Sequence, residues 1–382
     1  MKIAYCIPSC HKSGGMERVL SLKANYLSDV LGWEIIIITT EKAESSPAFP
    51  LSSAIRVLNL KIGYDDDSYL NFLERITDRL GKKKQHRRIL EETLKREQCD
   101  ICVSMFCHEM SFLADLNDGS KKVLELHFCK DFRQMDCLYN KKGVIRKFLG
   151  HLQNWNERRK IKKYDSFVVL TQEDAQAWGK TYNTSVIANP LSFSVEKTAD
   201  YSAHHAVAVG RLCPQKGFDL LIEAWALLPE DLKKEWDLTI YGNGGDKESL
   251  NKLIANNQLE NSIRIHEPVK NIQNHLIRNS LFCFSSRYEG FGMALIEAMS
   301  CGLSCISFAC PCGPKDLISH GVDGMLVEHL SVHKMALEIQ KLMENEERRR
   351  MLGENAQSTI KKQYSLDAIM NQWIKLFQEL GK

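Results

Sequence analysis

The sequence of 382 residues lacks any apolar run near the roughly 20 residues that a membrane-spanning helix needs; its most hydrophobic stretch is 35–38 with the neighbouring residues. It also lacks a secretory signal, so its 13 cysteines are expected in a reducing compartment, the cytoplasm, rather than in disulfides. The near-zinc spacing Cys99-x-x-Cys102 falls in a predicted strand, where residues three apart face opposite sides, so no metal site is expected. No nucleic-acid recognition motif is present, and no nucleic-acid partner is expected.

Positive charge is concentrated in the first half of the chain, although the net charge is only +3. Residues 1–190 hold 30 Lys and Arg against 24 Asp and Glu, whereas residues 191–382 hold 21 against 24. The stretch from Lys141 to Lys163 alone holds nine cations and one acid, interleaved with apolar residues. Two interpretations stay open: an anionic membrane surface, where each cation contributes about 1 kcal/mol, or an ordinary solvated helix face. The membrane interpretation gains from a second basic cluster, Lys82, Lys83, Lys84, Arg87 and Arg88.

Short apolar runs typical of buried parallel strands alternate with helical segments along the whole chain. The chain length fits two domains, and 44% hydrophobic and 26% charged residues are typical of a globular protein. The alternation predicts two doubly wound α/β domains, with a division after Pro190. The predicted strands are 2–7, 33–39, 101–104, 123–127, 166–170 and 185–188 in the first domain, and 205–209, 238–241, 263–266, 281–284, 304–308 and 325–327 in the second.

The segment from Leu281 to Gly302 combines a strand, a glycine-containing loop and a helix with two carboxylates, Glu289 and Glu297. Glu297 is the one ionisable side chain of an apolar helix and sits near its C-terminus, where the macrodipole disfavours negative charge by about 0.3 to 1 kcal/mol. A buried carboxylate needs donors, and a ribose diol would supply two. Glu289, in the loop, is free to meet sugar hydroxyls. The alternative is that Glu297 pairs with a neighbouring Arg and Glu289 is solvated.

Backbone amides between the two carboxylates add to this candidate site. Gly290, Phe291 and Gly292 precede the helix, and a helix N-terminus favours phosphate. Arg211 and Lys216 follow the first strand of the second domain, at the edge where ligands bind in open α/β sheets, and two cations there could neutralise a diphosphate leaving group.

Several strings of the chain resemble glycosyltransferase family 4, the retaining, metal-independent enzymes of GT-B fold. The strings are SRYEGFGMALIEAM, SGGMERVL, VGRLCPQKGFDLLIEAW, IYGNGG and GPKDLISHGVDGMLV, which together span most of the chain. The resemblance implies two Rossmann-like domains facing each other across a cleft. The C-terminal helix, with Ser365 as its cap and an apolar stripe, would cross back onto the first domain. The implied domains are 1–190 with 364–382, which would bind the acceptor, and 191–363, which would bind the donor.

The resemblance also implies roles for individual residues. Arg211 and Lys216 would bind the diphosphate, and His127 would lie near the reacting sugar carbon and its 6-hydroxyl. Glu289 would contact the donor sugar and Glu297 the ribose. Backbone approach to the donor, or for the first pair alternatively to the acceptor, is expected at Gly14 and Gly15, at Gly242 and at Gly313, although a plain loop or turn also explains Gly242.

The expected function is retaining transfer of a hexose or N-acetylhexosamine from a nucleoside-diphosphate sugar to a growing glycan or lipid-linked saccharide. The pathway would be that of a cell-surface polysaccharide such as a lipopolysaccharide or capsule, at the cytoplasmic face of the membrane. No cofactor and no metal ion are expected. A UDP-sugar is the expected donor, but His266-Glu267-Pro268 stands where many relatives have glycine near the base, which leaves base selectivity open.

Two other functions compete with this one. A nicotinamide-dependent oxidoreductase would fit the opening strand-helix-strand unit, but the sequence lacks the G-x-G-x-x-G turn. A catalytically silent nucleotide-sugar-binding protein would keep the fold without the activity. The run Asp65-Asp66-Asp67 imitates the metal motif of a different glycosyltransferase fold, and an exposed acidic turn is the preferred interpretation.

Overall fold

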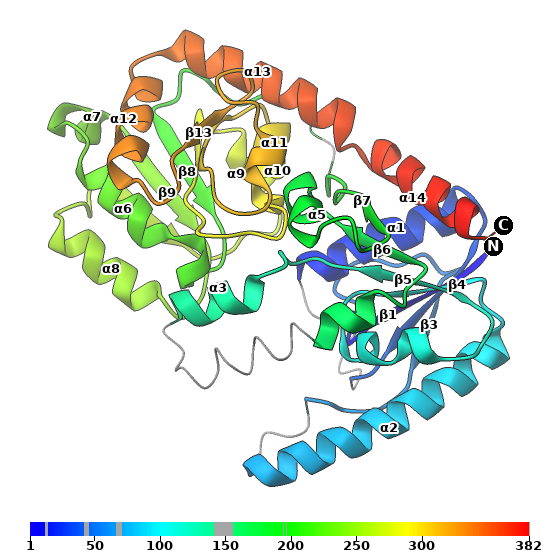
Figure 1. Cartoon of the computed structure of the whole chain (residues 1–382). Coiled ribbons are helices and arrows are strands. Elements are labelled where there is room, and N and C mark those ends of the chain that lie inside the picture. Colours follow the sequence, from blue (N-terminus) through cyan, green and yellow to red (C-terminus); the bar gives the residue numbers. More distant parts are fainter. Residues whose placement is uncertain are drawn as a thin grey trace.

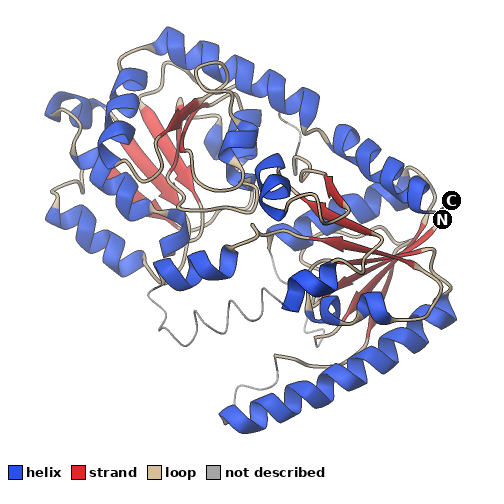
Figure 2. Cartoon of the chain, in the orientation of Figure 1, coloured by secondary structure: helices blue, strands red, loops and turns tan. Residues whose placement is uncertain are grey.

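The structure is a computed structural model that describes residues 1–11, 14–41, 46–65, 71–140, 156–193, 195 and 197–381. Two parallel sheets, each flanked by helices, make up the molecule (Figures 1 and 2). The predicted pair of doubly wound sheets is confirmed.

The first sheet has seven strands in the order β3-β2-β1-β4-β5-β6-β7, and neighbouring strands pair in parallel. Successive side chains of β1 enter different cores: Ile3 and Tyr5 pack in one cluster, and Ala4 and Cys6 in another. Both faces of this sheet are therefore buried, which is why its central strands read as continuous apolar runs. The strands are β1 (Lys2–Ile7), β2 (Glu34–Thr39), β3 (Arg56–Asn59), β4 (Ile101–Ser104), β5 (Lys121–Glu125), β6 (Ser166–Val169) and β7 (Thr184–Val186).

Four labelled helices and two short 3-10 turns connect the strands of the first sheet. The longest, α2, begins with a capping box in which the Asn71 side chain accepts from the Glu74 amide and the Glu74 side chain accepts from the Asn71 amide. It ends at Gln98, which adopts a left-handed conformation. The helices are α1 (Gly15–Asp29), α2 (Phe72–Glu97), α3 (Phe132–Tyr139) and α5 (Gln172–Trp178), and the turns are η1 (His108–Ser111) and η2 (Leu113–Asp115).

The second sheet has six strands in the order β10-β9-β8-β11-β12-β13. They are β8 (His205–Val209), β9 (Asp237–Tyr241), β10 (Ile263–His266), β11 (Leu281–Phe284), β12 (Ser304–Phe308) and β13 (Met325–Val327). The elements between these strands are η3 (Pro214–Lys216), α6 (Phe218–Ala226), α7 (Glu230–Glu235), α8 (Lys247–Asn256), α9 (Gln273–Leu276), α10 (Met293–Ser300) and α11 (Pro314–Leu317), and α12 (Val332–Met343) and α13 (Glu346–Gln363) follow the last strand.

The last helix, α14 (Leu366–Leu380), returns to the first sheet, as expected (Figure 1). Its cap is Ser365, whose side chain accepts from the Ala368 amide at 3.3 Å. Its apolar stripe includes Trp373 and Phe377, which are buried in the same core cluster as β1. The return passes beside the first crossing between the sheets, because the Leu191 amide donates to the Tyr364 carbonyl at 2.8 Å. The division of the chain after Pro190 stays a prediction.

The bounds of several predicted strands need correction, among them β7, which is Thr184–Val186 rather than 185–188, and one strand was not predicted. Strand β5 ends at Glu125 rather than His127, so His127 lies two residues beyond the strand, in the loop. Strand β3 was not predicted, because it is an edge strand whose first residues, Arg56 and Val57, are exposed and show no apolar run.

Candidate active site between the two sheets

The predicted site residues lie at the carboxyl ends of parallel strands in both sheets. In the second sheet, Arg211 and Lys216 follow β8, Gly242 follows β9, Glu289 follows β11 and Gly313 follows β12. In the first sheet, Gly14 and Gly15 follow β1 and His127 follows β5. Carboxyl edges are where open α/β sheets bind ligands.

The two carboxyl edges touch at the loop before α10. A Cβ added at Gly290 would lie 2.2 Å from the carbonyl oxygen of His127, so only glycine allows this approach. A Cβ at Gly313 would lie 2.0 Å from the carbonyl oxygen of Phe291, and Gly292 has a φ of 104°. Packing therefore already requires these glycines, and their predicted contacts with the donor stay predictions.

Close packing explains the glycine at one of the three remaining predicted positions, Gly242, and not at Gly14 or Gly15. A Cβ at Gly242 would lie 2.0 Å from the carbonyl oxygen of Gly210, which agrees with a structural turn. A Cβ at Gly15 would meet no atom within 4 Å, and one at Gly14 would meet the flexible Glu17 side chain. Packing of described residues thus gives no reason for glycine at position 15, the first residue of α1.

Glu297 is buried, as predicted, with 6% of its surface exposed. Its Oε1 accepts from Arg18 Nη1 at 2.7 Å and from Ser192 Oγ at 2.9 Å. Burial raises the pKa of Glu297, and Arg18 and Ser192 oppose that rise. Glu297 therefore pairs with an arginine, as the alternative interpretation expected. This arginine lies on α1, a helix that packs against the first sheet. Both of these bonds go to one carboxylate oxygen, and the role of Glu297 toward a ribose stays a prediction.

Glu289 is also buried, with 6% exposed, so the alternative of a solvated Glu289 is wrong. Its Oε1 accepts from Lys216 Nζ at 2.6 Å and from Ser286 Oγ at 2.6 Å. Lys216 lies in η3, which follows β8, so the loops after neighbouring strands β8 and β11 supply the two charges. The structure brings together the predicted sugar ligand and the predicted phosphate ligand.

Arg211 lies beside this pair but is more open. Its Nη2 donates to Gln215 Oε1 at 3.2 Å, and the residue is exposed. Gln215 in turn donates to the Tyr288 carbonyl at 3.1 Å, which connects the loop after β8 to the loop after β11.

Behind His127 lies a buried ion pair that the sequence did not predict. Lys23 Nζ lies 2.5 Å from both carboxylate oxygens of Glu125, and neither side chain is more than 1% exposed. His127 Nε2 lies 3.2 Å from Glu125 Oε1. The Lys23 ammonium also lies 4.0 Å from the centre of the Trp373 ring, on α14. Successive contacts of Lys23, Glu125 and His127 thus connect Trp373 of the C-terminal helix to the candidate site.

Further contacts between the two sheets lie at the N-terminus of α5. Asp316 accepts from the amides of Gln172 at 2.7 Å and Glu173 at 3.4 Å. Glu173 accepts from the Cys312 amide at 2.9 Å and pairs with Lys315. These contacts could not be predicted from the sequence, because they depend on how the two sheets face each other.

Two predicted charged segments fall partly or wholly outside the described residues. Of the basic stretch from Lys141 to Lys163, residues 141–155 are not described. In the described part, Lys160 and Lys163 pair with Asp115. Of the acidic run, positions 66 and 67 are not described.

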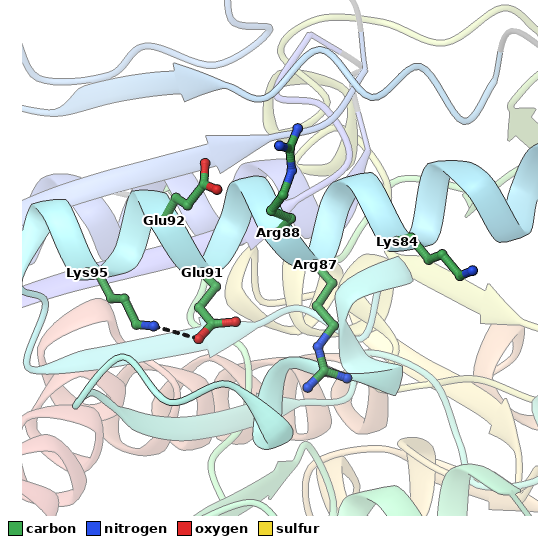
Figure 3. Close-up of a pocket in the computed structure, with 6 residues that line it drawn as sticks. All are labelled: Lys84, Arg87, Arg88, Glu91, Glu92 and Lys95. Atoms are coloured by element: carbon green, nitrogen blue, oxygen red, sulfur yellow. Dashed lines mark hydrogen bonds and ion pairs between the residues drawn. The ribbon is translucent and has the colours of Figure 1, made fainter.

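A charged surface lies on α2 (Figure 3). Six side chains of this one helix line an open hollow of about 380 Å³. Among them, Lys95 donates to Glu91 at 2.7 Å. Lys84, Arg87 and Arg88 are exposed there and belong to the second predicted basic cluster. No described helix is long and apolar enough to cross a membrane.

Residues 198–359 match the family model described as "Glycosyl transferases group 1". An "Uncharacterized glycosyltransferase" of Haemophilus influenzae is 26% identical over 379 residues, which is 97% of this chain and 98% of that protein. The "Amylovoran biosynthesis glycosyltransferase AmsD" of Erwinia amylovora is 30% identical over 230 residues, 56% of this chain and 64% of that protein.

Solved structures resemble the whole chain. Sucrose-phosphate synthase from Thermosynechococcus elongatus has a TM-score of 0.81 at 16% identity and covers 99% of this chain and 98% of its own. TarM of S. aureus, in a complex that includes UDP and alpha-GlcNAc-glycerol, has a TM-score of 0.77 at 15% identity. The match covers 99% of this chain and 100% of the TarM chain. The protein has the GT-B fold, and the fold and the family match together support a glycosyltransferase of this class.

Proposed function

We propose that this protein is a retaining glycosyltransferase that transfers a hexose or N-acetylhexosamine from a nucleoside-diphosphate sugar, expected to be a UDP-sugar, to a growing glycan or lipid-linked saccharide. The observation that carries the proposal is the placement of Glu289, Lys216 and Glu297 on neighbouring loops and a helix where the two carboxyl edges meet. The names of the matched relatives support a place in polysaccharide biosynthesis, and the UDP in the TarM complex supports the expected base.

In the proposed reaction the donor lies at the second sheet and the acceptor at the first. Lys216 and Arg211 neutralise the diphosphate as the bond between sugar and phosphate breaks. Glu289 contacts the donor sugar and Glu297 the ribose. His127 lies near the reacting carbon, and no side chain is assigned as a nucleophile. Because two side-chain cations face the leaving group, no metal ion is needed for its charge.

The experiment is a screen of nucleotide-sugars for thermal stabilisation of the purified protein and for slow donor hydrolysis. The nucleotide-sugar that stabilises the protein and is hydrolysed is then used as donor in transfer assays. The Glu297→Ala variant is expected to lose transfer. Addition of EDTA is expected to leave the activity of the wild type unchanged. Glu338→Ala, on α12 and paired with the exposed Lys341, is the matched control. A wild type that binds a donor but is inert toward all acceptors would favour the silent binding protein.

We further propose that α2 holds the first sheet against an anionic membrane surface. Exposed Ile76 and Leu80 lie on the same helix face as the cations at Lys83, Lys84 and Arg87, because these positions are three or four residues apart. An apolar end next to exposed cations suits the boundary between lipid head groups and acyl chains.

Vesicles test this part of the proposal. The protein is expected to sediment with phosphatidylglycerol vesicles and not with phosphatidylcholine vesicles, and to lose binding when Lys83, Lys84 and Arg87 are changed to Glu. Lys252→Glu, an exposed lysine of α8 in the other half of the chain, is expected to leave binding unchanged. Equal sedimentation of the triple variant and the wild type would overturn the assignment to α2.

A further inference from the structure

A second cavity lies at the carboxyl edge of the first sheet, outside the residues assigned to the donor. Its volume is about 480 Å³. Its lining comes from the loops that follow β1, β4 and β5, from α1, η1 and α3, and from residues 156 and 157. Three neighbouring strand ends thus surround a space large enough for a sugar unit.

This cavity lies beside the loop that precedes α10. Phe128 lines the cavity, and its Cα would lie 3.1 Å from a Cβ placed at Gly290. His127, the residue predicted to lie near the reacting carbon, directly precedes it. A molecule in the cavity would therefore lie next to the donor loop.

The walls of the cavity are rich in methionine and phenylalanine. Phe128 is 43% exposed, and it is stacked on Phe132 with ring centres 4.8 Å apart, which fixes the plane of its ring. Phe106, on the loop after β4, has a φ of 58°, a left-handed conformation that is strained for a phenylalanine. Backbone strain of this kind, about 1–3 kcal/mol, occurs at binding and active sites. Both rings present flat apolar surfaces without charge.

The described lining carries no net charge. Arg133 supplies a cation, but it pairs with Glu157, which is also part of the lining. Desolvation lowers the pKa of His108, which disfavours the charged form of its ring. A phosphate or carboxylate group would find no unmatched cation among these residues, and its desolvation would not be compensated.

We infer that this cavity is the acceptor subsite and that it takes the terminal ring of a neutral saccharide, with the C–H face of the sugar on Phe128, rather than a phosphate-bearing polymer. The inference rests on the proposed function, because it names the acceptor class of the same site. Aromatic rings bind one face of a ligand and leave its hydroxyls to neighbouring polar groups.

The first test is a binding measurement without donor, using chitobiose, maltose and lactose as neutral probes and oligo(glycerol phosphate) as the charged probe. Saturation-transfer NMR of the wild type is expected to show binding of at least one neutral disaccharide and no binding of the charged probe. Phe128→Ala is expected to raise the Kd of that disaccharide about tenfold, whereas Phe128→Tyr keeps it. Leu227→Ala, a similarly exposed apolar residue of the second half, serves as the matched control.

Donor hydrolysis in the absence of acceptor separates this inference from the proposed function. Phe128→Ala is expected to raise the KM for the acceptor, whereas the control Leu227→Ala is expected to leave both the KM and the donor hydrolysis unchanged. Preferred binding of oligo(glycerol phosphate), absence of binding by all three disaccharides, or an unchanged Kd in Phe128→Ala would each overturn the acceptor class. A protein that binds the disaccharides but no nucleotide-sugar would instead contradict the proposed function.

Discussion

Replacement of Lys216 by methionine is expected to lower kcat for sugar transfer by about two to three orders of magnitude, which is the usual effect of removing one group that stabilises developing charge. Methionine keeps the length of the side chain and removes its charge. The Lys216 ammonium forms an ion pair with Glu289 at 2.6 Å. The variant therefore also leaves a buried carboxylate without its ion pair.

Kinetics with the donor found in the screen separate these two effects. Lys216→Arg keeps the positive charge and is expected to keep more activity than Lys216→Met. Lys341→Met, which removes an exposed lysine of the same half that pairs with Glu338, is expected to have unchanged kcat. If Lys216→Met keeps its kcat and loses only thermal stability, Lys216 supports Glu289 and does not stabilise the leaving group.

Replacement of Lys23 by methionine is expected to lower the free energy of unfolding by about 3–5 kcal/mol, the usual cost of removing one partner of a buried ion pair. Lys23 and Glu125 are both less than 2% exposed, so neither charge can be hydrated in the folded protein. The double variant Lys23→Met and Glu125→Leu removes both charges and is expected to regain much of the loss.

Urea unfolding provides the measurement, with Lys252→Met as the matched control. Lys252 forms an exposed pair with Glu248, and its loss is expected to cost only about 0.3–0.5 kcal/mol. If the double variant is as unstable as Lys23→Met, the loss comes from packing against Trp373 and not from the unpaired charge.

The same pair predicts a particular dependence on pH. Burial alone would raise the pKa of Glu125, but Lys23 and His127 outweigh it and lower this pKa from 4.5 to about 2. Because the folded pKa lies below the unfolded one, the contribution of Glu125 to stability is present above about pH 4.5. It is lost as the pH falls toward 2. The stability difference between the wild type and the double variant should therefore shrink as the pH falls from about 4.5 toward 2.

Most strands could be predicted because parallel strands that are covered on both faces are apolar throughout. Leu281–Phe284 and Ser304–Phe308 have the predicted bounds for this reason. Strand β3 was missed because half of it faces solvent. The cap and stripe of α14 were predicted from Ser365 and from helical spacing, which are local signals.

The partners of the site residues could be predicted only in part. The burial of Glu297 followed from the apolar residues around it in the helix. Its partner Arg18 lies in SGGMERVL, a string that resembles the family, but nothing in the sequence shows that α1 faces α10. The pair of Lys23 and Glu125 joins a helix to a strand end about 100 residues away. Such pairs depend on tertiary packing, which neither periodicity nor composition encodes.

The chain passes between the two sheets twice, and the two passages are hydrogen-bonded to each other at Leu191 and Tyr364. Ser192 follows Leu191 directly, and its hydroxyl donates to Glu297 at 2.9 Å. A ligand that takes over the hydrogen bonds of Glu297 would therefore release Ser192, one residue from the bond that joins the two passages. We expect nucleotide binding to change the packing at this junction of the two halves.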